Sequence, residues 1–554
     1  SSGTQMTALL TIFLVFGILS LILSGILVAT VVSAMLAKEV RQIGVMKAIG
    51  GRTVQIAVIY GAMVAIVGGI AVAVGTVLGM AAGRTFSKVV ASLLNFTIYN
   101  DAIPAWVFVL QAAAGILVPL VISLVPILRA TRMTVHEALS DYGVSLNSDA
   151  ATGAQPRRRV SDRVSRKITL AVRNTFRRRG RLVLTLGLLA AGGAMFTMAL
   201  NVSTAWRVSL EKGFKSRHYD FEIRLGKPES VEKVMGLLSA IPGVAFAEPW
   251  GIAPASLSRD GGVEITRTYP DGGHGSFSLR GVPVNTRSVT MPVLSGRWLS
   301  PDDTNAVVLN PMGRYLFPGI KVGETVSLNV GGKVTRWEVV GFADETAPAS
   351  AYVAERVFEQ TLMGAGITTA FRVTTTDKTL DARGTVIARI EGELDKAGVS
   401  LSAVIADAAF RNAISDHIYI LIFALVFMAA LMGGVGLLGL ASTMSANVIE
   451  RTRELGVMRA IGGTPGAIQH LIVSEAVFIG LLSLIVSAVV TLPLSYVVGR
   501  FLGDMAFKTP LPLAVSLTGG LLWVFIAVAG SALSSALPAW RASRLTVRET
   551  LSYE

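Results

Sequence analysis

Side chains that could carry catalytic or metal chemistry are sparse in this 554-residue sequence. It contains no cysteine, which excludes disulfides, thiolate catalysis and cysteine-ligated metal sites. It also lacks the GxxxxGK(S/T) loop that cradles nucleotide phosphates. The histidines are scattered without the HExxH spacing of a zinc enzyme: His136, His218, His274, His417 and His470. We therefore expect no catalytic residue, metal site or cofactor in this chain.

Two short motifs stand out instead, because each occurs twice. Ile43–Gly51 reads IGVMKAIGG and Leu455–Gly463 reads LGVMRAIGG, an offset of 412 residues. The stretch from Pro126, PILRATRMTVHEAL, returns from Pro538 as PAWRASRLTVRETL at the same offset of 412. Two separate matches at one offset indicate a duplicated unit.

The IGVMKAIGG-type motifs predict short amphipathic helices that end in a glycine pair. One face of each helix carries three apolar residues: Ile43, Met46 and Ile49 in the first copy, and Leu455, Met458 and Ile461 in the second. A single helix of this kind could lie on the lipid surface with its basic residues toward the head groups. Its repetition at the same place favours two equivalent cytoplasmic partners, one for each half.

Long apolar stretches surround both motifs. Hydrophobic residues make up 52% of the chain and charged residues only 16%, against about a quarter charged in a soluble domain. A helix needs about 20 apolar residues to cross roughly 30 Å of hydrocarbon. We expect seven such helices, at residues 7–35, 54–82, 105–128, 182–205, 417–445, 467–498 and 516–538.

The net charge of +14 comes from Lys and Arg beside these stretches. This is the positive-inside pattern of membrane proteins, so we expect no nucleic-acid partner. The basic residues fall on one side if the spans alternate, in the segments 38–52, 129–132, 157–181, 451–459 and 541–548. We assign that side to the cytoplasm, with the C-terminus inside and the segment 206–412 outside.

The external segment alternates strand-like and helix-like patterns. We predict two βαβ units, with strand, helix and strand at 219–226, 229–241 and 244–250, then at 371–376, 379–397 and 399–406. A glycine-rich segment of short strands, 251–365, lies between them. The expected fold is a multi-pass α-helical membrane protein with an α+β extracytoplasmic domain, a split βαβ with a β-rich insertion.

The duplication divides the chain into five parts. A span and the external domain precede the last three spans, but neither precedes the first three. We therefore expect an upstream span and external domain to be missing before Ser1. The predicted parts are a first three-span module at 1–140, a basic linker and amphipathic helix at 141–181, a span at 182–205, the external core domain at 206–412 and a second three-span module at 413–554.

Small residues recur within the spans. Gly75 and Gly79 are spaced as GxxxG, and Gly192 lies beside Gly193. Such residues let helix backbones approach closely, so we expect tight helix contacts at both places.

The second short motif and its surroundings resemble a known family. Residues 450–462, ERTRELGVMRAIG, resemble the coupling-helix signature of FtsX-like permeases, the class that includes MacB. The closing stretch from Pro538 and the basic segment 170–179 resemble further parts of that family. The external segment 296–341 resembles its MacB-type periplasmic core domain. The resemblance covers nearly the whole chain, and the order and duplication of the motifs make it specific.

The resemblance implies the permease subunit of a bacterial ABC transporter in the cell membrane. In that family the coupling helix docks into a groove on an ATPase, so two motifs imply two copies of a cytoplasmic ABC ATPase that bind ATP and Mg²⁺. The resemblance further implies membrane lipids, and an accessory lipoprotein or periplasmic protein, as partners to be expected. The implied role couples ATP hydrolysis to motion of the external domains, for export or extraction of a lipophilic, lipoprotein or peptide substrate.

The resemblance also assigns ATPase coupling to residues of both motifs: Arg41, Ile43, Gly44, Met46, Lys47, Ile49, Gly50, Glu450, Arg453, Glu454, Leu455, Gly456, Met458, Arg459, Ile461 and Gly462. The first copy departs from the pattern, because Gln42 stands at the position of Glu454 and Lys47 at that of Arg459. Either the two contacts are unequal or these differences are neutral drift.

Two other functions fit parts of the sequence. A mechanotransmitter would use the same architecture to activate a cell-wall hydrolase or sensor without moving cargo. A membrane-embedded enzyme or an ion-coupled carrier would need ionisable groups within the spans. Glu475 is the main such group, and the equivalent residue of the first copy is Met63. We interpret Glu475 as a packing or snorkelling glutamate near the cytoplasmic end.

Overall fold

The computed structural model describes residues 2–93, 98–100, 102–135, 175–176, 179–257, 277–345 and 348–544. It divides into two units, each described by itself. Unit 1 comprises Ser1–Leu9, Val202–Tyr419 and Tyr496–Ala514, and unit 2 comprises Leu10–Asn201, Ile420–Ser495 and Val515–Glu554. Most of the predicted linker 141–181 and the closing stretch after Arg544 lie outside the described residues.

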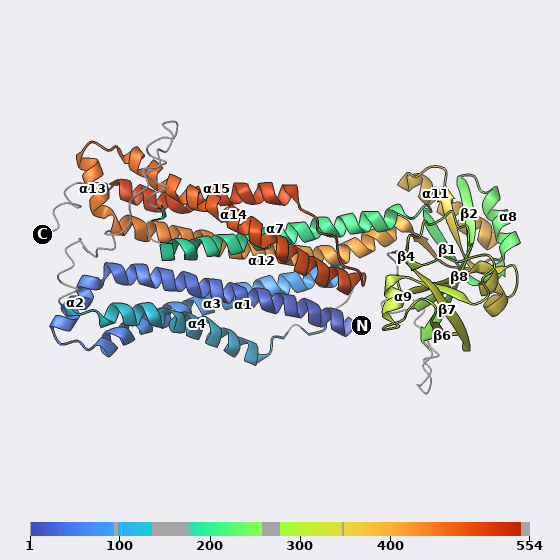
Figure 1. Ribbon diagram of the computed structural model, residues 1–554, viewed down its shortest axis with the longest axis horizontal. Helices are drawn as coiled ribbons and strands as arrows, with labels where there is room; N and C mark the ends of the chain where they lie inside the picture. Colours follow the sequence, from blue (N-terminus) through green and yellow to red (C-terminus); the bar gives the residue numbers. More distant parts are fainter. Residues whose placement is uncertain are drawn as a thin grey trace. The chain divides into compact units, whose positions relative to one another are not determined.

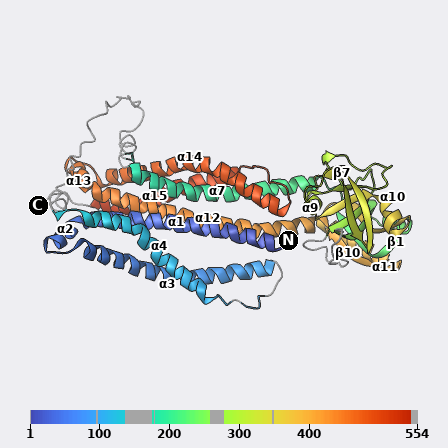
Figure 2. The same cartoon turned by 60° about the horizontal axis from the view of Figure 1, so that its bottom comes forward.

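Seven described helices are long and apolar enough to cross a membrane. They are α1 (Ser2–Lys38), α3 (Thr53–Leu93), α4 (Ala105–Arg132), α7 (Arg179–Lys215), α12 (Asp407–Glu450), α14 (Pro465–Ala506) and α15 (Leu517–Arg544). Each covers its predicted span to within one residue, so the prediction of seven spans is confirmed. Most extend further, because backbone hydrogen bonding continues into polar residues that hydropathy does not mark. In Figures 1 and 2 the parts of these helices in unit 2 run side by side.

The duplication is visible in the helix boundaries. A long helix, a short helix and two long helices follow one another in each module: α1, α2 (Val40–Ala48), α3 and α4, then α12, α13 (Thr452–Ala460), α14 and α15. The ends of α1, α2 and α4 and the starts of α2, α3 and α4 recur at the 412-residue offset in the second module. The two copies therefore share a backbone plan as well as a motif.

Of the glycines predicted to lie at close helix contacts, only some do so in unit 2. A Cβ on Gly192 of α7 would come within 2.9 Å of the Cα of Gly433 in α12, so these two backbones nearly touch. The prediction is confirmed there. A Cβ on Gly75 or Gly79 would meet no described atom within 4 Å. Within the described residues the prediction for this GxxxG pair is wrong, because no atom of another element lies against the two glycines.

Unit 1 contains the predicted split βαβ. The six elements are β1 (Phe221–Ser230), α8 (Val231–Ala240), β2 (Val244–Leu257), β9 (Ile367–Thr375), α11 (Leu380–Lys396) and β10 (Leu401–Ala406). The strands pair antiparallel in the order β10-β1-β9-β2. Strand β9 of the second βαβ therefore lies between β1 and β2, the two strands of the first βαβ. Both helices bury residues at helical spacing against this sheet, as Val386, Ile390 and Leu394 show in α11.

The β-rich insertion forms a closed ring of six strands. Its new strands are β3 (Phe277–Val282), β5 (Ala306–Leu309), β6 (Thr325–Val330), β7 (Lys333–Ala343) and β8 (Ser350–Ala354). The ring runs β2-β3-β8-β5-β7-β6 and returns to β2, because β6 pairs with both β7 and β2. β4 (Val293–Gly296) extends the sheet from β7, and the short helices α9 (Pro311–Tyr315), α10 (Glu355–Phe358) and η1 (Glu359–Met363) lie between strands.

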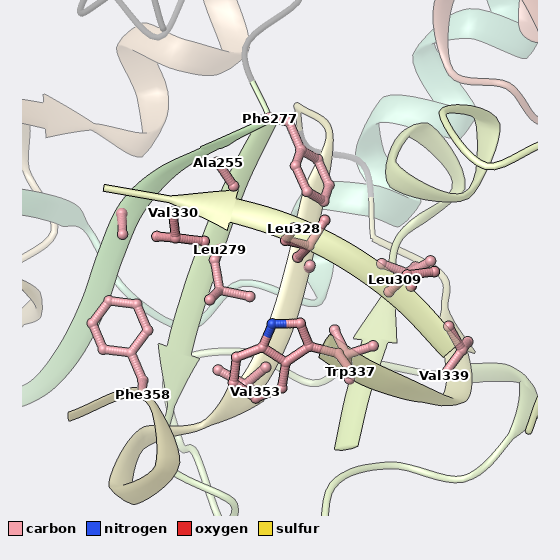
Figure 3. Packing of buried hydrophobic residues seen from close by; sticks show 14 of the residues in the cluster. Ala255, Phe277, Leu279, Leu309, Leu328, Val330, Trp337, Val339, Val353 and Phe358 are labelled. Carbon is pink, nitrogen blue, oxygen red and sulfur yellow. The ribbon is translucent and has the colours of Figure 1, made fainter. Parts of the chain in front are cut away.

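Alternate residues of the ring strands fill its interior. Figure 3 shows Trp337 of β7 beside Val353 of β8 and Leu279 of β3 within this cluster. All three side chains are buried. Alternation with period two puts every second residue of a strand on the same face. The pattern explains why a segment that reads only as glycine-rich and strand-like in the sequence forms a packed core.

A buried carboxylate of the split βαβ, Glu222, binds three arginines, of which Arg280 comes from β3 of the insertion. Its oxygens lie 2.9 Å from Arg224, 3.2 Å from Arg372 and 3.4 Å from Arg280. Burial alone would raise the pKa of Glu222, but the three guanidinium groups outweigh it and lower the pKa from 4.5 to about 2. The ionised form is therefore the one that stabilises this domain.

Glu222→Gln is expected to destabilise the domain by about 3–5 kcal/mol, because it leaves buried arginines without their charge partner. Since the pKa is lowered on folding, the wild-type contribution is present above about pH 4.5 and is lost as the pH falls toward about 2. Hydrogen exchange of β1 and β9 amides in the full chain measures both effects. Glu229→Gln in the same strand is the control, since Glu229 pairs with the more exposed Lys233. Equal protection in both variants would contradict this account.

Candidate functional site

Two short helices connect long helices at equivalent places in the two modules. Both α2 and α13 lie at the same end of the unit 2 helices in Figures 1 and 2. Each follows a bend at its N-cap, where Glu39 has a ψ of 6° and Arg451 a ψ of 13°. The N–H of each N-cap residue still donates to the carbonyl four residues earlier, at 3.2 Å. The chain therefore turns while keeping these backbone hydrogen bonds.

Both short helices end in the same glycine turn. Gly50 and Gly462 have φ angles of 98° and 100°, left-handed values that glycine adopts without steric cost. Each donates its N–H to the carbonyl three residues earlier at 3.0 Å. The next residue, Gly51 or Gly463, donates to the carbonyl five residues earlier at 2.9 Å. This pair of bonds is the Schellman motif, and it accounts for the glycine pair that ends both sequence motifs.

One face of each short helix packs on its own module. Ile43 is only 1% exposed and lies in a buried cluster with residues of α1, α3 and α4. Leu455 is 3% exposed and lies in the equivalent cluster with residues of α14 and α15. The half-buried Met46 and Met458 pack against the same clusters. The glycines Gly44 and Gly456 are buried beside them. These predicted site residues therefore hold the helices in place.

The other face is apolar and exposed. Ile49 and Ile461 are 82% and 80% exposed, and Val45 and Val457 are 49% and 47% exposed. We call four exposed apolar residues of each copy the coupling tip: Val45, Ala48, Ile49 and Gly50 in the first, and Val457, Ala460, Ile461 and Gly462 in the second. The polar Gln42 and Glu454, one to two turns earlier, are exposed as well. Equivalent positions are thus exposed to nearly the same degree in both copies.

Three apolar residues of each short helix are predicted to share one face, and this prediction is wrong for the third residue, Ile49 or Ile461. Ile43 and Met46 face the module, but Ile49 is exposed, and Leu455, Met458 and Ile461 divide in the same way. Ile49 and Ile461 are the C-cap residues. The chain leaves helical geometry there, so helical periodicity no longer gives the direction of their side chains.

The basic residues predicted near the end of each motif turn back to their own module. Lys47 Nζ donates to the carbonyl of Met133, just after α4, at 2.5 Å. Arg459 Nη1 donates to the carbonyl of Ser543, in the last turn of α15, at 3.0 Å. A helix C-terminus has unpaired carbonyls and a partial negative charge, which these cations satisfy. Lys47 and Arg459 thus fix the short helix against the end of the third span.

The second copy carries an ion network that joins the predicted site residues Glu450 and Glu454 to three residues outside the predicted site, Arg181, Arg451 and Glu475. Arg451, at the bend before α13, lies 3.1 Å from Glu454 and 3.2 Å from Glu475 of α14. The side chain of Glu475 is 4% exposed. Glu475 is therefore a packed, buried residue, as one of the two interpretations holds, and the other, a snorkelling glutamate, is wrong because its carboxylate forms a buried ion pair. In the first copy the equivalent residues are Glu39, Gln42 and Met63, which cannot form it.

A second pair joins α12 to α7 in the same network. Arg181 Nη2 lies 2.9 Å from Glu450, and Arg181 Nη1 donates to Asn447 at 2.9 Å. These residues and the Arg451 group line a small pocket of about 90 Å³. The predicted site residues Arg41 and Arg453 lie in α2 and α13, and their side chains are outside the described set. Two sequence signals point to this network: the alternating charges of 450–454 and the ionisable Glu475 within a span.

No metal-binding group of three His, Asp or Glu side chains occurs within the described ranges. The ion network contains three carboxylates, Glu450, Glu454 and Glu475, but arginines occupy their oxygens. Its arrangement suits holding helices together at the start of α13 rather than binding a cation.

Solved structures similar to part of the chain come from two transporters. The periplasmic region of MacB from Actinobacillus actinomycetemcomitans aligns with a TM-score of 0.25 and 14% identity, covering 37% of this chain and 97% of that one. The extracellular domain of the noncanonic ABC-type transporter YknZ from Gram-positive bacteria aligns with a TM-score of 0.23 and 16% identity, covering 34% and 98%.

The family comparison concerns the two repeated modules. The model of the FtsX-like permease C-terminal family matches residues 14–135 and 418–547. The ABC transporter permease YtrF of Bacillus subtilis is 32% identical over 74 residues, 13% of this chain and 17% of YtrF. An uncharacterised ABC transporter permease of Methanocaldococcus jannaschii is 26% identical over 227 residues, 38% of this chain and 53% of that relative. The chain thus matches about half or less of the length of these relatives. Two regions of the chain thus match the FtsX-like permease C-terminal family, and parts of it are similar to ABC transporter permeases.

Proposed function

We propose that this chain is the membrane-spanning permease subunit of a system in which a separate ABC ATPase docks on both coupling tips. The ATPase would bind ATP and Mg²⁺, and this chain would supply no catalytic group. The observation that carries the proposal is the matched exposure of Ile49 and Ile461 at the ends of two equivalent helices. Two equivalent contacts suit two copies of one partner.

The chemistry of the tips favours a protein groove over a lipid surface. A helix lying on lipid turns its basic residues toward the anionic head groups. Lys47 and Arg459 point instead to the C-terminal carbonyls of α4 and α15. What remains exposed at each tip is uncharged and apolar. Full burial of a Val or Ile side chain contributes about 1.5–3 kcal/mol, so each tip offers enough apolar surface for a specific contact.

One helix connects the second coupling tip to the α+β domain, which supports the idea that movement of the tip moves that domain. α12 begins at Asp407, directly after β10, and ends at Glu450, directly before Arg451. Its 44 residues form one helix, about 66 Å long at roughly 1.5 Å per residue. We propose that the domain lies outside the membrane and that ATP-driven movement of α13 reaches it through α12. The function of this movement would be the export or extraction of a lipophilic, lipoprotein or peptide substrate.

Site-specific crosslinking tests which protein contacts the tips. The chain contains no cysteine, so Ile49→Cys or Ile461→Cys creates a single attachment point for a photoreactive maleimide. Illumination of native membranes is expected to capture an ABC ATPase from both positions, identified by mass spectrometry of the adduct. Val334→Cys, at a position 49% exposed in β7, is the control and should capture none. Absence of any ATPase adduct from both tips would overturn the proposal.

A further inference from the structure

A basic pocket in unit 1 lies where the long helices meet the α+β domain. It has a volume of about 310 Å³ and is lined chiefly by Arg217, Lys378, Arg383, Arg411, Asp220 and Asp407. Arg217 follows α7 by two residues, Asp407 begins α12, and Lys378 precedes α11. Pockets for small ligands have volumes of roughly 300–1,000 Å³, so this one can hold a compact polar group.

The two carboxylates of the pocket already have strong partners. Asp407 lies 2.8 Å from Arg217, whose side chain is only 4% exposed. Asp220 lies 2.6 Å from Arg383 and also accepts hydrogen bonds from the N–H and hydroxyl of Thr375. These two ion pairs neutralise both carboxylates of the pocket and hold Arg217 and Arg383 in place.

Two cations remain without such compensation. Among the described residues, no carboxylate forms an ion pair with Lys378 or Arg411, and both are exposed at the pocket. The residues that line the pocket therefore include four cations and two carboxylates, an excess of two positive charges. Ala408, in the first turn of α12, also lines it, so the positive end of a helix dipole adds to this field.

The position of the pocket along the chain limits the source of its ligand. Arg411 precedes the apolar span Leu421–Glu450 by ten residues of the same helix. At roughly 1.5 Å per residue, this distance is about 15 Å along the helix. Polar head groups add only about 5–8 Å on each side of the hydrocarbon core, so Arg411 lies beyond that layer. Free phosphate can reach the pocket there, and a lipid can do so only if its head group leaves the bilayer surface.

We propose that this basic pocket binds the phosphate group of an anionic ligand, with Lys378 and Arg411 as its direct contacts and Arg217 and Arg383 as fixed supporting charges. Such a site needs donors and positive charge that are not already neutralised, and Lys378 and Arg411 supply both. The phosphate can come from the head group of an anionic lipid or from free phosphate. Neither source is required by the proposed ATPase coupling, so the two proposals can fail independently.

Calorimetric titration of the full chain in a neutral detergent tests the pocket. The probes are monomeric dihexanoyl phosphatidylglycerol, dihexanoyl phosphatidylcholine and inorganic phosphate. Wild type is expected to bind phosphatidylglycerol or phosphate more tightly than phosphatidylcholine, and to bind it less tightly as salt increases. Tighter binding of phosphatidylglycerol makes the lipid the source, and equal or tighter binding of phosphate makes free phosphate the source. No binding of either anion by wild type overturns the proposal.

Matched variants locate the binding. Lys378→Gln with Arg411→Gln should weaken anion binding at least about tenfold, because each removes a charged hydrogen-bond donor. Lys378→Arg with Arg411→Lys keeps the charges and should retain most of the affinity. Lys227→Gln with Lys333→Gln removes the same charge from exposed positions outside the pocket and should change the affinity little. Equal weakening in the Lys227 and Lys333 variant would overturn the assignment to this pocket.

Discussion

Val457→Asp with Ile461→Asp is expected to weaken ATPase binding by at least about a hundredfold. The two side chains are 47% and 80% exposed in the free chain, so their replacement should leave the fold intact. In the complex, their burial would contribute about 3 kcal/mol or more, and two buried carboxylates would add a desolvation cost. The equivalent double variant at Val45 and Ile49 should have an effect of the same order.

The affinity is measured with the reconstituted permease and the ATPase that the tips capture. Ile461→Leu is a conservative control and should bind like wild type. Val334→Asp places the same charge at a site in β7 with the same 49% exposure as Val45, and it should also have no effect. Unchanged binding in both double variants would place the ATPase contact elsewhere.

Glu475→Met is expected to destabilise the second module by roughly 1–3 kcal/mol, because among the described residues it leaves Arg451 with Glu454 alone as an ion partner. Complete loss of a buried pair costs more, but the Arg451 side chain is 16% exposed and keeps some contact with water. Methionine is chosen because the first copy has Met63 at this position. Faster hydrogen exchange in 451–463, with a lower melting temperature, measures the effect.

A double-mutant cycle separates the ion pair from the loss of a side chain. Arg451→Glu with Glu475→Met gives the second copy the residues of the first, Glu39 and Met63. If the pair acts as a unit, the double variant should be less destabilised than the sum of its two single variants. Strict additivity would show that Arg451 and Glu475 do not stabilise each other.

The sequence predicts the helices of this protein well because their signals are local. Apolar runs of sufficient length locate the seven long membrane-crossing helices of the described chain, and a glycine pair marks the end of α2 and α13 through the Schellman turn. The order of strands and helices in the split βαβ also follows from local patterns. The closure of the six-stranded ring does not, since β6 and β2 are far apart in the sequence.

The candidate site is predicted only in outline for a similar reason. The motif locates α2 and α13, but periodicity cannot show which face the rest of the module covers. Lys47 and Met133 are separated by 86 positions, and Arg459 and Ser543 by 84, so no local pattern indicates that these cations satisfy helix ends. The pairing of Arg451 with Glu475 likewise depends on how α14 folds back after α13.

Sidedness of single cysteines is the most direct test of the central claim that both coupling tips face a cytoplasmic ATPase. Ile49→Cys, Ile461→Cys and Val334→Cys are each labelled with a membrane-impermeant maleimide in cells stripped of their wall and any outer membrane. The account predicts that Val334→Cys reacts in intact cells, whereas Ile49→Cys and Ile461→Cys react only after the membrane is permeabilised. Labelling of either coupling tip in intact cells would contradict it.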